Sequence, residues 1–188
     1  MRIGIFGGTF DPPHIGHLLA ATDACEALAL DRLVFIPAAE QPLKVGMVAA
    51  PAHHRVAMVE RLIAGDARFA VDALEIDRGG LSYTVDTLRV LRSRWAGDVA
   101  PFLLLGRDAV AALPKWREPE EVMSLAQVVV LTRAGESAEL PAGVRALATR
   151  RVDVSSTEVR ARVREGKSIR GFVPDAVATY IAAVGLYR

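Results

Sequence analysis

The chain has 188 residues, of which 52% are hydrophobic and 24% are charged, and its formal net charge is +1. This length and composition predict one compact α/β domain over residues 1–188, and the near-neutral charge gives no sign of a general nucleic-acid or membrane-binding surface. No apolar stretch approaches the roughly 18 residues of a membrane span, and the N-terminus does not resemble a signal peptide. The single cysteine, Cys25, excludes a disulfide framework and is consistent with a reducing cytoplasm.

The N-terminal stretch reads as a strand, a glycine turn and a helix. Residues 2–6 form a short apolar run that Gly7–Gly8 ends. Asp11 suits the N-cap of the following helix, and Pro12 suits its first position because proline has no N–H to leave unpaired. The helix is expected from about His14 to Leu28. Such a helix start directs backbone N–H groups and a positive dipole end at whatever lies above the strand, where anions bind readily.

Two histidines, His14 and His17, lie three residues apart in the first turn and are therefore expected on the side of that anion site. Half of a metal site is an alternative, but Cys25 is the only cysteine and no further His-rich cluster follows. The glycine spacing differs from the G-x-G-x-x-G dinucleotide fingerprint. A tight turn explains the glycines but gives no reason for two histidines beside a helix N-terminus. The helix dipole disfavours a protonated imidazole there, and a bound polyphosphate would reverse this effect.

The rest of the chain alternates between short apolar runs and apolar residues at helical spacing. Near-continuous apolar strands separated by helices predict a doubly wound, mostly parallel α/β sheet with helices on both faces. The expected strands lie at residues 33–36, 68–72, 102–105, 128–131 and 152–154. The expected helices lie at residues 52–64, 83–94 with Ser82 as its cap, 109–113, 118–125, 155–164 and 174–183.

In such a sheet the ligand crevice opens at the carboxyl ends of the strands, where the winding reverses. The distinctive polar groups follow strands in the sequence, so they are expected to share that edge of the sheet. They are His14, His17, Lys44 in the long 38–50 loop, Asp108, Arg133 and the group from Ser155 to Arg160.

A second chemically distinctive segment is V-D-V-S-S-T-E-V-R, which ends at Arg160. Ser155 and Glu158 have the spacing of a capping box. This leaves Arg160 unexplained, because the helix dipole disfavours a cation near a helix start unless an anion lies nearby. Residues 145–170 carry eight Lys or Arg and three Asp or Glu, and this positive patch on a near-neutral protein suits a polyphosphate.

Two segments resemble the signatures of the nucleotidyltransferase superfamily, whose members transfer a nucleotide monophosphate from ATP or CTP. Residues 7–17, G-G-T-F-D-P-P-H-I-G-H, are similar to G-x-F-D-P-x-H-x-G-H, and residues 154–160, V-S-S-T-E-V-R, are similar to I-S-S-T-x-x-R. The resemblance implies a Rossmann-like nucleotidyltransferase fold that holds the ATP triphosphate between these segments. The ATP-binding residues that it implies are Gly7, Gly8, Thr9, Phe10, His14, His17, Gly106, Asp108, Ser156, Thr157 and Arg160.

Residues 81–87, L-S-Y-T-V-D-T, and 105–116, L-G-R-D-A-V-A-A-L-P-K-W, look like the pyridine-mononucleotide site of bacterial nicotinate-nucleotide adenylyltransferases. With G-F-V-P and the Y-I-A-A-V-G-L-Y tail, the resemblance covers nearly the whole chain. It implies adenylyl transfer from ATP to nicotinate mononucleotide in NAD biosynthesis, giving nicotinate adenine dinucleotide and pyrophosphate. The acceptor-binding residues that it implies are Lys44, Tyr83, Thr84, Asp108, Trp116 and Arg133.

Elementary chemistry agrees with this acceptor. A helix start leaves the Tyr83 and Thr84 amides for a carboxylate, and Trp116 offers an aromatic face to a pyridinium ring, although a core or hinge tryptophan is the alternative. Lys44 and Arg133 could each bind the acceptor phosphate. The family's loop usually reads P-P-H-K where residues 41–44 read Q-P-L-K, so its usual histidine contact is missing here.

The expected mechanism is direct in-line transfer without a covalent intermediate. A phosphate monoester has a second pKa near ~6, so its oxygen is largely ionised at neutral pH and needs no general base. His17 would bind the α-phosphate, His14 and Arg160 the flanking phosphates, and Mg²⁺ would arrive with ATP rather than at a protein metal site. The alternatives are an adenylyltransferase for nicotinamide mononucleotide or phosphopantetheine, and a non-catalytic nucleotide sensor. A homo-oligomer is left open, because Ala-rich helix faces suit a core or an interface.

Overall fold

The computed structural model describes residues 1–42, 46, 48–133 and 140–188, without the side chain of Arg133. Its sheet contains six strands in the order β3-β2-β1-β4-β5-β6, and every neighbouring pair is parallel. The strands are β1 Arg2–Gly8, β2 Arg32–Pro37, β3 Phe69–Val71, β4 Ala100–Gly106, β5 Gln127–Arg133 and β6 Arg145–Thr149.

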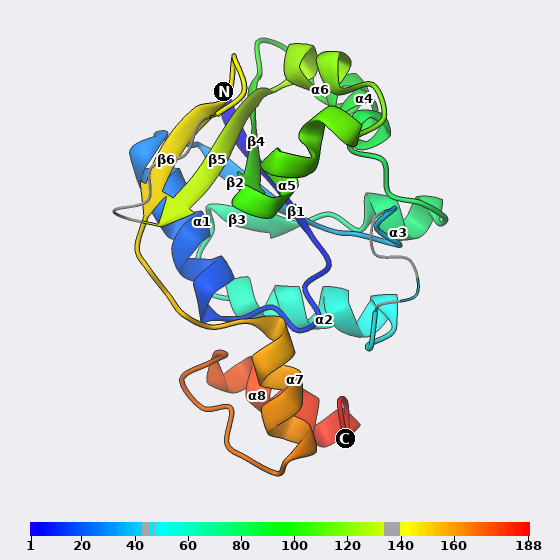
Figure 1. Ribbon diagram of the computed structural model, residues 1–188, viewed down its shortest axis with the longest axis vertical. Coiled ribbons are helices and arrows are strands. Elements are labelled where there is room, and N and C mark those ends of the chain that lie inside the picture. Colours follow the sequence, from blue (N-terminus) through cyan, green and yellow to red (C-terminus); the bar gives the residue numbers. More distant parts are fainter. Residues whose placement is uncertain (43–45, 47, 134–139) are drawn as a thin grey trace.

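Helices cover both faces of this sheet, so the predicted doubly wound α/β class is confirmed (Figure 1). One face packs on α1 and α2, and the other packs on α3 to α6, whereas α8 packs on α2. The helices are α1 Ile15–Ala27, α2 Ala52–Ile63, α3 Leu74–Arg78, α4 Thr84–Arg94, α5 Arg107–Ala112, α6 Pro119–Leu125, α7 Ser156–Arg164 and α8 Asp175–Val184, with a 3-10 turn η1 at Leu113–Lys115.

The strands read as continuous apolar runs because successive side chains enter two different cores. In β4, Phe102 and Leu104 join the core beneath α1 and α2, whereas Leu103 and Leu105 join the core beneath α4 and α5. All four side chains are at most 7% exposed. A parallel strand covered on both faces requires this composition.

The order of the strands positions the site. The chain winds from β1 to β2 and β3 on one side, and then returns to β4 on the other side of β1. The loops that leave β1 and β4 therefore separate and open a crevice at the carboxyl ends of these strands. Gly7–Gly8 lies at the end of β1 and Gly106 lies at the end of β4. In Figure 1, α7 and α8 lie together at the lower end of the molecule, beyond the loop that joins β1 to α1.

The prediction of a strand at 152–154 is wrong. These residues are in no strand, and the sixth strand is β6 at Arg145–Thr149. Only Leu147 and Thr149 of this edge strand are buried, so the strand lacks the continuous apolar run that marked the others. The half-buried Val152 and Val154 belong to the segment that leads into α7.

Cys25 lies in α1 and is 2% exposed. Burial raises the pKa of its thiol to about 11, so the thiol is protonated at neutral pH. No helix among the described residues is long and apolar enough to cross a membrane.

Candidate active site

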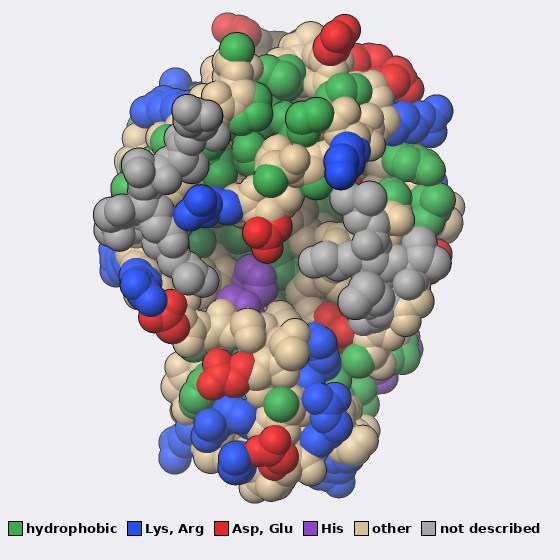
Figure 2. All heavy atoms as spheres, in the orientation of Figure 1, with side chains coloured by type: hydrophobic (Ala, Val, Ile, Leu, Met, Phe, Trp, Pro, Cys, Tyr) green, Lys and Arg blue, Asp and Glu red, His purple; other side chains and the backbone are tan. Residues whose placement is uncertain are grey.

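A cleft of about 930 Å³ opens at the carboxyl ends of β1 and β4. Figure 2 shows this face of the molecule hollowed, with histidine side chains at the bottom of the hollow and Lys and Arg gathered on the lobe below it. Of the residues predicted to bind substrates, eight line the cleft. They are Gly7, Gly8, His17, Tyr83, Thr84, Gly106, Trp116 and the exposed Asp108.

His14 and His17 form one stacked unit at the start of α1. Their ring centroids lie 3.8 Å apart with 31° between the ring planes, and the His14 backbone N–H donates to His17 Nδ1 at 3.1 Å. Because Nδ1 accepts, the proton of a neutral His17 ring resides on Nε2. A Cβ on Gly16 would lie 3.0 Å from the His14 ring, so glycine between the histidines permits this packing.

Both imidazoles are neutral at pH 7 in the unliganded protein. Burial lowers the pKa of His14 to about 4. The pKa of His17 also lies well below its usual value, mainly because of burial and secondly because of the neighbouring His14. The His14 Nδ1 atom is buried and has no hydrogen-bond partner among the described residues. The pair therefore offers polar ring nitrogens rather than fixed charges to a ligand.

The second motif reaches the first from the far end of the chain. Ser155 caps α7 by accepting the Glu158 N–H at 3.1 Å, as predicted. The Ser156 hydroxyl donates to the Pro12 carbonyl at 2.8 Å, and Arg160 Nη1 donates to the Asp11 carbonyl at 2.7 Å. The two motifs thus meet at the loop between β1 and α1, next to the histidine pair.

The prediction that Asp11 and Pro12 begin the first helix is wrong, because His14 is the N-cap of α1. Asp11 is instead 3% exposed, and its carboxylate accepts the N–H groups of Ala49 and Ala50 and the Tyr187 hydroxyl, at 2.7, 3.1 and 2.7 Å. The short side chain binds a distant loop rather than the next turn of its own chain. Sequence spacing cannot distinguish these two uses of an aspartate.

Arg55 supports the same loop and was not predicted. This α2 residue is 1% exposed. Its guanidinium donates to the Thr9 carbonyl at 2.8 Å, and at 3.3 Å to the carbonyls of Ala39 and Ala50. The nearby Asp11 charge favours the protonated form, although burial lowers the pKa of Arg55 overall. In the sequence an arginine inside an amphipathic helix reads as a surface residue.

Phe10 has a packing role. Its ring is 2% exposed, and its centroid lies 5.1 Å from that of His17 and 5.8 Å from that of Phe6. The Phe10 side chain therefore packs against His17, and the predicted contact of Phe10 with ATP stays a prediction. The predicted role of Thr157 remains a prediction; this residue is exposed, and its hydroxyl accepts a bond from Arg160 at 3.3 Å.

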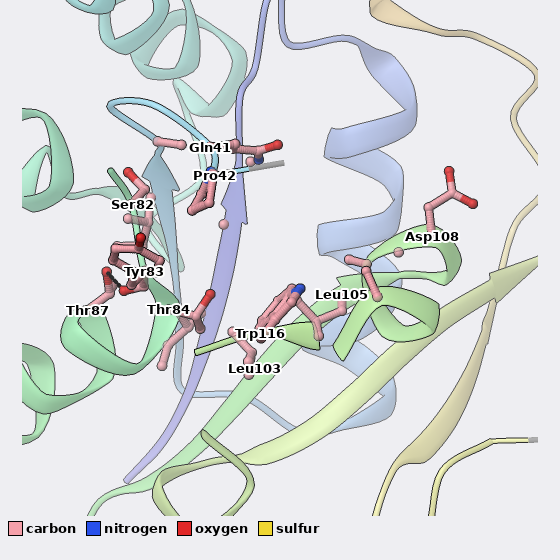
Figure 3. A pocket seen from close by; sticks show the side chains of 18 of the residues that line it. Gln41, Pro42, Ser82, Tyr83, Thr84, Thr87, Leu103, Leu105, Asp108 and Trp116 are labelled. Carbon is pink, nitrogen blue, oxygen red and sulfur yellow. Dashed lines mark hydrogen bonds between the residues drawn. The ribbon is translucent and has the colours of Figure 1, made fainter. Parts of the chain in front are cut away.

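The other end of the cleft is aromatic and apolar. Figure 3 shows Tyr83 and Thr84 on one wall and Trp116 with Leu103 and Leu105 on the other. The Trp116 ring is half-buried, packs against the core beneath α4 and also lines the cleft. It therefore combines the predicted ring-binding position with the alternative role of a core residue.

Ser82 does not cap α4, contrary to the prediction, because Tyr83 is the N-cap. The Ser82 hydroxyl oxygen accepts the Ala39 N–H at 2.9 Å, so it binds the loop after β2.

The sequence did not predict a role for Glu75, which also lines this part of the cleft. Glu75 in α3 is 7% exposed, accepts the Thr87 hydroxyl at 2.5 Å and lines the cleft. Burial raises the pKa of this carboxyl above its usual value.

Two predicted phosphate ligands are not tested by this geometry. Lys44 lies outside the described residues, and so does the side chain of Arg133, whose backbone ends β5. Within the described ranges, no group of three or more His, Cys, Asp or Glu side chains is placed to hold a metal ion.

Comparisons with known proteins agree with the motifs. Residues 5–162 match the cytidylyltransferase-like family. The chain is 56% identical over its full length to a protein of Gemmatimonas aurantiaca described as a probable nicotinate-nucleotide adenylyltransferase, covering 93% of that protein. A protein of Thermus thermophilus with the same description is 48% identical, with both chains covered completely.

The fold is shared with two solved structures of Plasmodium falciparum nicotinic acid mononucleotide adenylyltransferase, one complexed with APC and one with NaAD. Their TM-scores are 0.79 and 0.78 at 17% and 18% identity, with 99% of this chain and 96% and 97% of those chains covered. Fold, motifs and full-length similarity together identify an enzyme: the chain is a nucleotidyltransferase and belongs to the nicotinate-nucleotide adenylyltransferase family.

Proposed function

We propose that this enzyme transfers the adenylyl group of ATP to nicotinate mononucleotide and releases nicotinate adenine dinucleotide and pyrophosphate. The observation that carries the proposal is that one continuous cleft is lined by Gly7, Gly8 and His17 and also by Tyr83 and Trp116. We infer that the part beside His17 binds phosphates and the part beside Trp116 binds the pyridine ring. A dinucleotide product needs both a phosphate site and a site for an aromatic ring, because its diphosphate and its pyridine ring lie at different places in the molecule. The names of the full-length relatives support the same substrates.

At the phosphate end, the triphosphate of ATP lies against the start of α1 and the start of α7. Both helix starts direct N–H groups and positive dipole ends toward an anion. The bound anion raises the pKa of both imidazoles, and His14 supports His17 by stacking on it. Arg160 contributes its charge from α7 while one of its nitrogens holds the Asp11 carbonyl.

The reaction is a direct in-line attack. A phosphate oxygen of the mononucleotide forms a bond to the α-phosphorus of ATP, and the bond from that phosphorus to the bridging oxygen of pyrophosphate breaks. The attacking monoester is already largely ionised near neutral pH, so no side chain needs to remove a proton. His17 donates from Nε2 to the α-phosphate as charge builds there, and the enzyme acts by alignment and charge stabilisation.

Mg²⁺ enters this reaction as part of the ATP substrate. The ion prefers octahedral oxygen ligands and commonly takes them from phosphates and water, with one or two carboxylates at most. Asp108 is the exposed carboxylate on the lining of the cleft nearest the end of β4. Mg²⁺ bound to the phosphates would neutralise part of the charge of the leaving pyrophosphate.

At the acceptor end, the pyridine ring stacks on Trp116 and the nicotinate carboxylate lies at the start of α4. The Thr84 N–H is at the first position of that helix, where no intrahelical acceptor exists. An amide donor favours a carboxylate over the carboxamide of nicotinamide mononucleotide, which accepts more weakly. Lys44 and Arg133 remain proposed ligands of the acceptor phosphate.

The test is an acceptor panel. Pyrophosphate release from ATP is measured with nicotinate mononucleotide, nicotinamide mononucleotide and phosphopantetheine as acceptors. We expect the largest kcat/KM for nicotinate mononucleotide. A preference for either other acceptor would reassign the substrate, and ATP binding without pyrophosphate release with any acceptor would contradict the enzymatic proposal.

The in-line mechanism has its own test, because a single displacement inverts configuration at phosphorus. ATP made chiral at the α-phosphorus with sulfur should yield a dinucleotide of inverted configuration. Retention would require two displacements and would overturn the direct mechanism.

A further inference from the structure

Glu75 is a buried carboxyl group at the acceptor end of the cleft, and neither motif contains it. The residue lies in the short helix α3, is 7% exposed, and contributes to the lining of the cleft. A carboxyl group is costly to bury unless it is hydrogen-bonded. Its neighbours satisfy it, and those neighbours belong to the walls of the acceptor site.

One hydroxyl group binds this carboxyl directly. The Thr87 hydroxyl, in the first turns of α4, donates to Oε1 at 2.5 Å. Burial raises the pKa of the carboxyl, and the nearby Thr87 and Ser82 side chains partly offset this rise. Ser82 and Thr87 flank Tyr83 and Thr84, which line the cleft (Figure 3). The carboxyl group therefore holds the start of α4 through Thr87 and lies close to Ser82.

The chain of contacts continues into the loop after β2. The Ser82 hydroxyl oxygen accepts the Ala39 N–H at 2.9 Å, and the Ser82 N–H donates to the Glu40 carbonyl at 2.8 Å. This loop supplies Gln41 and Pro42 to the lining of the cleft. Glu75 thus lies where three segments meet, namely α3, the start of α4 and the loop after β2, at the point where an acceptor must enter.

We propose that Glu75 is a positioning residue that fixes the acceptor half of the cleft by holding the Thr87 hydroxyl group at the start of α4. The inference rests on the proposed function, because it takes nicotinate mononucleotide as the acceptor. Glu75 acts through the residue that it holds and touches no reacting atom. The triphosphate end is built from α1, α7 and Arg55, so it does not depend on this carboxyl group.

The test separates the two substrates. Glu75→Gln keeps the size of the side chain but weakens the bond from the Thr87 hydroxyl, because a neutral amide oxygen accepts less strongly than a carboxylate. We expect the KM for nicotinate mononucleotide to rise about tenfold or more, while the KM for ATP stays within about twofold of wild type. Asp77→Asn on the same helix is the matched control, because Asp77 is exposed, and both KM values should be unchanged.

Two further variants leave the carboxyl group unaltered: Thr87→Val removes its hydrogen-bond donor, and Ser82→Ala removes the hydroxyl that accepts the Ala39 N–H. Each should raise the acceptor KM, and Glu75→Gln combined with Thr87→Val should raise it by less than the product of the two single effects, because both changes break one contact. If Glu75→Gln fails to fold by circular dichroism, these two variants decide the question.

Two results would overturn the inference: an equal rise in both KM values, or a lower melting temperature with both KM values at wild type. A wild-type enzyme that fails to use nicotinate mononucleotide would overturn the proposed function and this inference together. An active wild type with normal acceptor KM values in the variants would overturn the inference alone.

Discussion

The two ends of the cleft are built in different ways. At the end that we propose binds phosphate, the first motif supplies Gly7, Gly8 and His17 to the lining of the cleft, and the buried Asp11 and Arg55 fix the loop that follows β1. At the acceptor end, an indole ring and a helix start face the cleft, and a single buried carboxyl group, Glu75, ties the walls together. The phosphate end therefore depends on many polar contacts to the backbone, whereas the acceptor end depends on an aromatic ring and one buried carboxyl group.

This difference matches the two tasks of a transferase. Charge develops on the α-phosphate during the reaction, and preorganised donors stabilise it without rearranging. The acceptor only has to be recognised and aligned, which shape and a few polar contacts achieve. Damage to the phosphate end should therefore lower turnover, whereas damage to the acceptor end should raise the KM for one substrate.

His17→Ala should have the largest effect. Removing a donor to the transition state should lower kcat by about 10²–10³-fold, with the fold intact. Steady-state kinetics measures the loss, and His53→Ala is the control because His53 is exposed at the start of α2. A His17→Ala enzyme with wild-type turnover would contradict the role of this imidazole.

Arg55→Met tests whether the phosphate end depends on its buried support. The change leaves the carbonyls of Thr9, Ala39 and Ala50 without their donor and Asp11 without its nearby positive charge. The free energy of unfolding should fall by about 3 kcal/mol in urea denaturation. Arg164→Met, at an exposed position in α7, should change it by under about 0.5 kcal/mol. Equal losses in the two variants would remove the special role of Arg55.

The histidine pair predicts a pH dependence of stability. The folded-state pKa of His14 is about 4 and its ordinary value is 6.5, so the unfolded chain binds the proton first as pH falls. Stability is then complete above pH 6.5 and decreases toward pH 4, by about 2 kcal/mol after allowance for partial solvent exposure. In His14→Gln the free energy of unfolding should depend less steeply on pH over this interval. Parallel curves for wild type and variant would refute the assignment.

Trp116→Ala should have the smallest effect and should concern one substrate only. Loss of the stacking surface should raise the KM for nicotinate mononucleotide about tenfold and leave the KM for ATP near wild type. Trp95→Ala is the matched control, because Trp95 packs on the same core but does not line the cleft. A rise in the KM for ATP would break the division between the two ends.

The sequence predicted the parts of this molecule that depend on local patterns. Apolar runs located five of the six strands, because a parallel strand covered on both faces requires them. The histidine pair and the Ser155 cap were also predicted, since their partners lie three residues away. The edge strand β6 was missed because only one of its faces is buried.

The supporting polar residues could not be predicted, because their partners are distant in the sequence. Asp11 binds amides almost forty residues away, and Arg55 binds Thr9 across a similar distance. Ser82 had the right type and position for a cap but serves Ala39 instead. Glu75 and Arg55 are charged residues in helices, and nothing in a helical pattern marks such a residue as buried.

The most direct test of the account is a crystal structure of the enzyme with nicotinate adenine dinucleotide bound. We expect the bridging diphosphate within hydrogen-bond distance of His17 Nε2 and the pyridine ring stacked on Trp116. A dinucleotide bound outside this cleft, or with its pyridine ring beside the histidine pair, would contradict the division of the cleft into a phosphate end and an acceptor end.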